Sequence, residues 1–181
     1  MKAIPTELPE VLILEPRVFA DDRGYFFESW NQRMFAQATG VDIPFVQDNH
    51  SYSLRNVLRG IHYQVVRPQG KLVRVVAGTV LDVAVDLRNS SPTFRRWVAV
   101  ELSADNRRQL WIPPGFGHGF VVRSDAAVFL YKTTEFWFAE HDRSVRWSDP
   151  QLAVDWDLDE EPILAAKDAA APLLAEAEVF A

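Results

Sequence analysis

Hydrophobic and polar residues alternate along short stretches that are rich in β-branched and aromatic side chains and are separated by Gly, Pro, Asn and Asp. This pattern is typical of β-strands bounded by turns. The strands are expected at residues 11–14, 25–30, 58–64, 71–77, 79–87, 96–102, 108–112, 119–123 and 126–135. Many short strands at close spacing favour a sandwich or a barrel over a parallel α/β sheet.

Helical signals are few. A helix is expected at residues 31–39, because Gly40 can take the left-handed backbone conformation that ends a helix. The alanine-rich tail predicts a second helix near residues 165–171, interrupted by Pro172. No repeat or linker divides the chain, so residues 1–181 are expected to form a single domain with a C-terminal helical tail.

Composition narrows the classes of function. Of the 181 residues, 48% are hydrophobic and 24% are charged, which is ordinary for a globular protein. The formal net charge of −6 gives no overall electrostatic case for binding nucleic acid. The absence of cysteine excludes disulfides, thiolate metal sites and thiol nucleophiles. No apolar stretch approaches the roughly 18 residues of a membrane span or forms a signal-peptide core, so a cytoplasmic protein without a membrane partner is expected.

The strand at residues 79–87 has two different faces. One carries only Leu and Val and is expected to pack in the core, whereas the other carries Asp82 and Asp86. A solvated outer face and the polar wall of a pocket both explain these acids, since a small barrel can hold one small ligand.

Two motifs could carry chemistry. In residues 59–64 (RGIHYQ), regular alternation puts His62 and Gln64 on one face and Arg59 on the other. In residues 111–120 (WIPPGFGHGF), the Pro-x-Gly-x-x-His core resembles the second cupin motif, which aims His118 into a barrel. The first motif of metal-binding cupins supplies a His-x-His pair and a downstream Glu, but here the pair is His-x-Gln and residues 65–78 contain no acid. We therefore expect no metal and no other cofactor, with a metal-dependent cupin as an alternative.

Three polar residues on the expected strands form a chemically sensible set. His62 is joined by Lys71 at the head of the next strand and by Tyr131 within an apolar strand. Singly, each has an ordinary structural explanation: a lysine that extends to water or a tyrosine that fills the core. Together they supply a base, a group that stabilises an oxyanion, and an acid.

The chain resembles the dTDP-4-dehydrorhamnose 3,5-epimerases over nearly its whole length. The matching segments are residues 22–28 (DRGYFFE), 47–51 (QDNHS), 57–64 (VLRGIHYQ), 70–74 (GKLVR), 82–88 (DVAVDLR), 111–120 (WIPPGFGHGF), 131–150 and 166–168 (AKD). The resemblance implies an all-β fold of the cupin type, a double-stranded β-helix or jelly-roll barrel with short peripheral helices.

The resemblance also implies roles for individual residues. His62 matches the catalytic base, Asp168 its paired carboxylate, Tyr131 the proton donor on the opposite face of the sugar, and Lys71 the residue that stabilises the enolate oxygen. The positions that match nucleotide- or sugar-binding residues are Arg23, Glu28, Gln47, Asn49, Arg59, His118 and Lys167. In the family, the equivalents of Arg23 and Glu28 reach into the partner subunit's site, which implies a homodimer.

Two positions depart from the family pattern. The family usually has a tyrosine near Trp137, so an aromatic ring beside the nucleotide is preserved while a hydroxyl is lost. A binding glutamate appears here as Asp142, with Glu140 close by. Both departures concern recognition of the nucleotide or the sugar rather than the expected chemistry.

The expected reaction is epimerisation at carbons 3 and 5 of dTDP-4-dehydro-6-deoxy-D-glucose. The 4-keto group makes the hydrogens on these carbons acidic, and histidine titrates near neutrality, so His62 can remove them. Tyrosine, with an ordinary pKa of about 10, stays protonated until the enolate takes its proton. The alternatives are an epimerase acting at one carbon only, a metal-dependent cupin, and a non-catalytic cupin that binds a sugar nucleotide.

Overall fold

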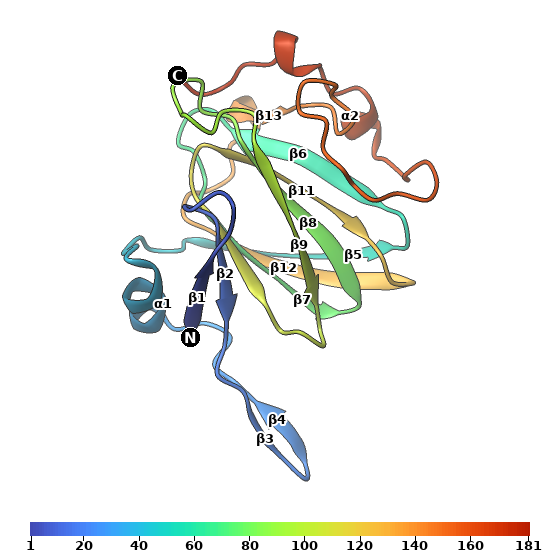
Figure 1. The fold of residues 1–181 in the computed structure, drawn as a ribbon. Coiled ribbons are helices and arrows are strands. Elements are labelled where there is room, and N and C mark those ends of the chain that lie inside the picture. The colour runs from blue at the N-terminus through green and yellow to red at the C-terminus, as the bar shows by residue number, and fades with distance from the viewer.

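The chain forms two antiparallel sheets that face each other and a separate hairpin, as described by a computed structural model of residues 1–181 (Figure 1). The strands are β1 (Lys2–Pro5), β2 (Leu12–Glu15), β3 (Phe19–Asp21), β4 (Gly24–Phe26), β5 (Gln47–Leu54), β6 (Leu58–Gln64), β7 (Lys71–Ala77), β8 (Thr79–Asp86), β9 (Trp97–Ser103), β10 (Gln109–Ile112), β11 (Phe116–Val122), β12 (Ala126–Thr133) and β13 (Asp142–Ser144). The six-stranded sheet has the order β1-β2-β10-β7-β12-β5, and the five-stranded sheet has the order β13-β6-β11-β8-β9. The predicted jelly-roll barrel of the cupin type is confirmed.

The main hydrophobic core lies between the two sheets. Side chains from β7, β8, β9, β10, β11 and β12, together with Leu8 and Val11 from the segment between β1 and β2, form one cluster of 16 buried residues that includes Phe120 and Phe129. Phe120 and Phe129 come from opposite sheets and stack with their ring centroids 4.2 Å apart. This apolar cluster fills only part of the interior, and polar side chains occupy the rest.

The outer face of the five-stranded sheet is also buried. Val83, Val85 and Leu87 pack there beneath the C-terminal segment, which contributes Leu174 and other apolar residues. The inward face of β8 carries Asp82 and Asp86, which are both fully buried. A solvated face is therefore wrong for these two acids, because the barrel interior lies on one side of β8 and the tail covers the other.

Short helices cover the edges of the barrel. The helix α1 (Gln32–Thr39) begins where the side chain of Asn31 accepts a hydrogen bond from the Met34 N–H and ends at Gly40, whose φ is 74°. Phe35 of α1 packs against Trp111 on the outer face of the six-stranded sheet. The helix predicted near residues 165–171 is shorter than expected, because α2 (Ala166–Ala169) has only four residues. Single turns of 3-10 helix occur at Ala139–His141 and Leu174–Glu176.

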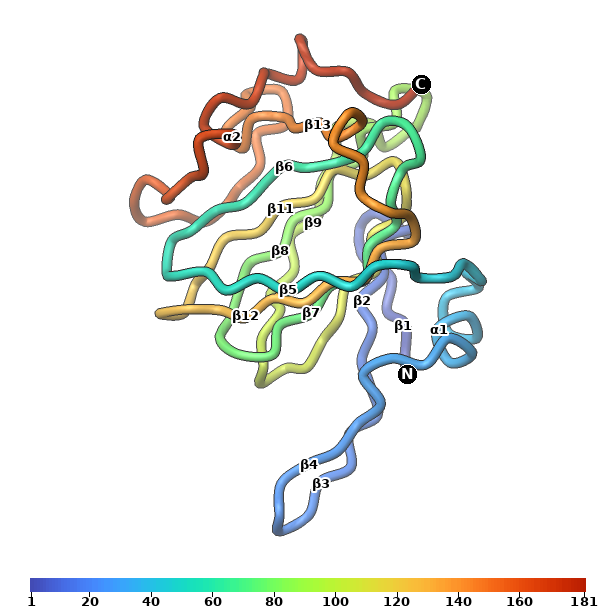
Figure 2. Tube along the Cα trace, turned by 180° about the vertical axis from the view of Figure 1, so that it is seen from behind, coloured from blue at the N-terminus to red at the C-terminus, as the bar shows by residue number.

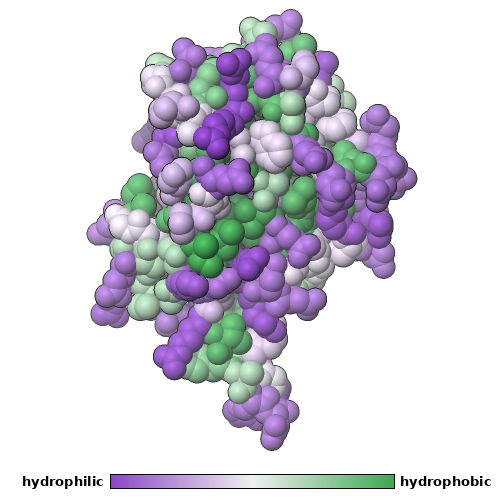
Figure 3. Space-filling view, in the orientation of Figure 1, coloured by the Kyte–Doolittle hydropathy of each residue, from purple (hydrophilic) through white to green (hydrophobic).

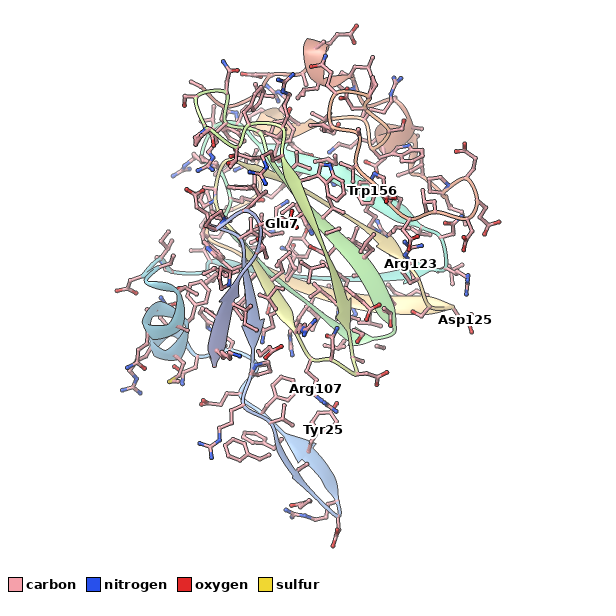
Figure 4. The ribbon with its side chains drawn as sticks, in the orientation of Figure 1. Glu7, Tyr25, Arg107, Arg123, Asp125 and Trp156 are labelled. Carbon is pink, nitrogen blue, oxygen red and sulfur yellow. The ribbon has the colours of Figure 1, made fainter.

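The hairpin of β3 and β4 projects from the barrel (Figure 1). Its base contacts the barrel through the Arg107 guanidinium, which lies 4.3 Å from the centroid of the Tyr25 ring (Figure 4). Phe19 and Phe26 are exposed, and Figure 3 shows hydrophobic surface along this projection. Neither α1 nor α2 has the length and hydrophobicity that a membrane-spanning helix needs.

The observed strands differ from the predicted ones at several places. The strand expected at residues 25–30 stops at Phe26, because the chain leaves the hairpin there and turns toward α1. The sequence pattern missed β5, which is an edge strand with a polar inward face and an exposed outward face, and so lacks alternating apolar residues. The short strands β1, β3 and β13 were missed as well.

Candidate active site

A cavity of about 280 Å³ opens into the barrel between the two sheets. Seen from behind, β5, the edge strand of one sheet, lies across from β6 of the other sheet (Figure 2), and both strands contribute lining residues. Its lining residues are Ser51, Arg59, His62, Tyr63, Gln64, Gln69, Lys71, His118, Phe120, Phe129, Tyr131, Trp137, Asp142 and Lys167. Eight of the residues predicted from the sequence therefore line one cavity.

A bulge in β6 brings Arg59 and His62 to the same side. His62 pairs with His118 across the ladder to β11, and Arg59 pairs with Phe120, so the register shifts between them. The predicted separation of Arg59 from His62 onto opposite faces is wrong, because the irregular residue at Gly60 breaks the alternation. Gly60 has a φ of +132°, and a Cβ there would lie 2.5 Å from the Cα of Gly119.

His62 is bonded to a buried carboxylate. Its Nε2 lies 2.5 Å from Oδ1 of Asp168, a residue 106 positions later in the chain. Asp168 belongs to α2 and is buried, whereas the His62 side chain is 32% exposed. The carboxylate therefore lies behind the imidazole and orients it, while the ring remains open to the cavity.

Lys71 lies inside the barrel and does not extend to water. Its Nζ donates a hydrogen bond of 3.3 Å to the carbonyl oxygen of His62. Burial lowers the pKa of Lys71 to about 8, and the nearby charges of Asp142 and Asp82 partly offset this. A lysine with this pKa is largely protonated at neutral pH and provides a positive charge within the cavity.

Tyr131 lines the cavity from the opposite sheet. It lies on β12, whereas His62 lies on β6. Burial raises the pKa of the Tyr131 hydroxyl, and the charge of Asp142 adds to this effect. The hydroxyl is therefore held in its protonated form, as a proton donor requires.

His118 has a carboxylate partner of its own. Its Nε2 lies 2.9 Å from Oδ2 of Asp82, and both side chains are buried. Burial lowers the pKa of His118 and raises the pKa of Asp82. From the sequence, Asp82 could be assigned only to the possible polar wall of a pocket. Its pairing with a histidine 36 positions away could not be predicted, because no local pattern connects the two residues.

Among the remaining predicted binding residues, Trp137, Asp142 and Lys167 line the cavity, whereas Gln47 and Asn49 are not among its lining residues. Gln47 and Asn49 lie on the inward face of β5 and are bonded to each other, and Asn49 has a buried Nδ2 group without a partner. Lys167 forms an ion pair with Asp142 at the cavity. Trp137 lines the cavity with 56% of its surface exposed.

Arg23 and Glu28 are not brought to this cavity. Arg23 lies at the tip of the β3–β4 hairpin, where it pairs with Asp21 and is almost fully exposed. Glu28 follows the hairpin and accepts a hydrogen bond from Asn31. The chain's own fold therefore leaves both residues away from its cavity.

Some lining residues have no signal in the sequence. Ser51, Gln69 and the rings of Phe120 and Phe129 line the cavity, although polar or aromatic residues of this kind are common on any strand. No group of three or more His, Cys, Asp and Glu side chains comes together as a set of metal ligands.

Comparisons with known proteins give a consistent result. The family model described as dTDP-4-dehydrorhamnose 3,5-epimerase matches residues 5–176. The dTDP-4-dehydrorhamnose 3,5-epimerase of Pseudomonas aeruginosa is 58% identical over 180 residues, which cover 99% of each chain.

Solved structures agree with the sequence comparisons. A dTDP-6-deoxy-D-glucose-3,5-epimerase from Legionella pneumophila, in complex with dTDP-4-keto-L-rhamnose, superposes with a TM-score of 0.94 at 50% identity, covering 97% of this chain and 93% of that one. A 3′-monoepimerase from Streptomyces bikiniensis, in complex with dTDP-quinovose, gives a TM-score of 0.89 at 36% identity, covering 97% and 88%. The chain thus belongs to the dTDP-4-dehydrorhamnose 3,5-epimerase family and is a carbohydrate epimerase, an enzyme of the isomerase class.

Proposed function

We propose that this enzyme converts dTDP-4-dehydro-6-deoxy-D-glucose to dTDP-4-dehydro-L-rhamnose by inverting carbons 3 and 5. The observation that carries the proposal is the position of His62 and Tyr131 on opposite sheets around one cavity, with His62 bonded to Asp168. Inversion needs a base on one side of a sugar ring and an acid on the other, and this pair can supply both.

In the proposed mechanism, His62 removes the proton from the carbon beside the ketone. The electrons of the C–H bond form the enolate, and its negative charge on the oxygen is stabilised by the Lys71 ammonium. The Tyr131 hydroxyl then donates a proton to the opposite face of the same carbon, which restores the ketone with inverted configuration. His62 and Tyr131 return to their starting protonation states by exchange with water, and the sequence repeats at the second carbon.

Several residues are proposed to bind the substrate. The Arg59 guanidinium suits the diphosphate because it offers a planar set of N–H donors. The unpartnered Nδ2 of Asn49 is available to an oxygen of the substrate. The indole of Trp137 offers a flat apolar surface to the thymine base. Gln47, His118, Asp142 and Lys167 complete the set proposed to contact the nucleotide or the sugar.

A homodimer is part of the proposal. The exposed aromatic residues of the β3–β4 hairpin and the distance of Arg23 and Glu28 from the chain's own cavity support a hairpin that reaches a partner subunit. Arg23 and Glu28 would then complete the site of that subunit.

The experiment is to incubate the metal-stripped enzyme with dTDP-4-keto-6-deoxyglucose in deuterated water and to follow carbons 3 and 5 by NMR. Deuterium is expected at both carbons with the wild type and at neither with His62→Asn. An absence of exchange in the wild type would refute the proposed substrate. Dependence of the activity on an added divalent metal would favour a metal-dependent cupin instead.

A second candidate is epimerisation at carbon 3 alone. The resemblance to the Streptomyces bikiniensis 3′-monoepimerase favours it, because the two proteins share the fold over nearly the whole chain. The same NMR experiment separates the candidates, since deuterium at carbon 3 alone would identify a monofunctional enzyme.

A further inference from the structure

Three consecutive backbone N–H groups beside the cavity are each bonded to a side chain. The N–H of Phe136 donates to Oε1 of Glu135 at 2.9 Å, and the N–H of Trp137 donates to Oε1 of Gln47 at 3.1 Å. The N–H of Phe138 donates to Oε1 of Gln64 at 2.9 Å. This segment crosses from β12 of one sheet toward β13 of the other (Figure 2), so its backbone has no strand partner at these groups.

Gln64 makes the most extensive of these connections. Besides accepting from Phe138, its Nε2 donates to the carbonyl oxygens of Arg67 at 2.7 Å and Phe136 at 3.2 Å. The side chain is buried on the inward face of β6, two residues from His62. Gln64 thus joins β6 to the backbone on both sides of Trp137.

An amide is the side chain that this arrangement requires. It must accept a hydrogen bond from one N–H and donate to two carbonyl oxygens, which a carboxylate, an imidazole or an alkyl group of similar reach cannot do together. In metal-binding cupins the equivalent position of the His-x-His pair supplies a metal ligand. In this chain the amide group is directed to backbone atoms instead.

We propose that Gln64 is a positioning residue for nucleotide recognition, which holds the backbone of residues 136–138 so that the Trp137 indole is fixed beside the cavity. The inference rests on the proposed function, in which Trp137 contacts the thymine base. Trp137 is more than half exposed, and the hydrogen bond that holds it runs from its backbone N–H to Gln47, so its place depends on the bonds of this backbone segment. A loop fixed before binding loses less conformational entropy when the nucleotide arrives.

The test measures the affinity of the full-length protein for thymidine 5′-diphosphate by calorimetry. The variants are Gln64→Leu, Gln64→Glu, Trp137→Ala and the double variant Gln64→Leu/Trp137→Ala. Each single variant is expected to weaken binding by about tenfold, and the double variant to bind no more weakly than Trp137→Ala. Gln64→Glu has the size of glutamine but turns a carboxylate toward two carbonyl oxygens, so it should behave like Gln64→Leu.

Two further readouts separate positioning from a general loss of structure. In Gln64→Glu, KM for the nucleotide sugar should rise more than kcat falls, and amide hydrogen exchange should speed up in residues 134–138. Ser124→Ala is the matched control, because the Ser124 side chain also bonds several backbone groups, those of Thr79 and Ala126, but does not line the cavity. This control should bind thymidine 5′-diphosphate as the wild type does.

The outcomes distinguish the inference from the proposed function. If Trp137→Ala weakens binding while both Gln64 variants bind normally, Gln64 has no positioning role and the proposed function stands. If the effects of Gln64→Leu and Trp137→Ala simply add, Gln64 does not act through Trp137. If the wild type does not bind thymidine 5′-diphosphate at all, the proposed function fails and the inference fails with it.

Discussion

His62 and His118 lie directly opposite each other on the antiparallel strands β6 and β11, and each ring is bonded to a different aspartate. The two pairs differ in their access to the cavity, since the His62 side chain is 32% exposed and the His118 side chain is 8% exposed. Exchange of protons with water is easier for the more exposed ring. This difference favours His62 as the base and leaves His118 as a hydrogen-bonding partner for the substrate.

Replacing Asp168 by Asn should lower kcat by about 10²–10³-fold while KM changes little, because the imidazolium formed during proton abstraction loses its counter-charge. Steady-state kinetics with product analysis measures both constants. Asp159→Asn, in an exposed loop, is the control and should behave as the wild type. A normal kcat in Asp168→Asn would remove Asp168 from the mechanism.

Tyr131→Phe should retain deuterium exchange from solvent and lose inversion at one carbon by more than about 10²-fold, since the base remains and the opposite donor is gone. NMR of the product in deuterated water separates exchange from inversion. Tyr52→Phe, on the exposed face of β5, controls for the loss of a hydroxyl. Normal epimerisation by Tyr131→Phe would show that another group donates the proton.

Lys71→Met should abolish most activity and make the protein more stable at neutral pH. The pKa of Lys71 is lowered from 10.5 to about 8 by burial, so the charged form opposes folding by an amount on the order of 3 kcal/mol. This cost is fully present below pH 8 and disappears as the pH rises from about 8 to about 10.5. The free energy of unfolding in urea, measured at pH 7 and pH 10, should therefore differ between variant and wild type mainly at pH 7.

The control for this prediction is Lys132→Met on the neighbouring strand, where the lysine faces outward and pairs with Asp48. It removes the same charge without relieving burial and should not stabilise the protein. A Lys71→Met variant that is less stable than the wild type at pH 7 would contradict the assigned cost of burial.

Gly60→Ala should destabilise the fold by about 2–4 kcal/mol, because the new Cβ would overlap the Gly119 backbone and the positive φ disfavours alanine. Gly24→Ala is a matched control, since Gly24 has nearly the same φ of +131° but nothing within 4 Å of an added Cβ. Urea unfolding of both variants isolates the steric part. Equal losses of stability would mean that the contact with Gly119 contributes nothing.

Mixing two inactive variants should restore activity if the hairpin completes the partner's site. In a heterodimer of Arg23→Ala and His62→Asn, one site combines an intact His62 with an intact hairpin from its partner. Random exchange of subunits should then give about a quarter of wild-type activity. A mixture of Arg23→Ala with the double variant Arg23→Ala/His62→Asn should remain inactive, and failure of the first mixture to recover would place Arg23 in its own subunit's site.

The sequence by itself determined the class of fold and most of the residues around the cavity. Alternation of apolar residues located the central strands, because their side chains are buried on one or both faces. Gly40 located the end of α1, because a residue in the left-handed conformation closes a helix and satisfies its free backbone groups. The residue pattern marked His62, Lys71 and Tyr131 as a chemically sensible set, the resemblance to a family gave each a role, and the structure brings all three to one cavity.

Only the tertiary structure decided which side of β6 Arg59 occupies, because the bulge at Gly60 depends on close contact with Gly119 of another strand. It also decided that β5 is a strand, since that polar segment is held by its ladder to β12 rather than by its own pattern. The pairing of Asp82 with His118 and of Gln64 with the backbone around Trp137 joins residues far apart in the chain. Local residue patterns report burial and turns, whereas these bonds arise from the way the sheets and the tail pack together.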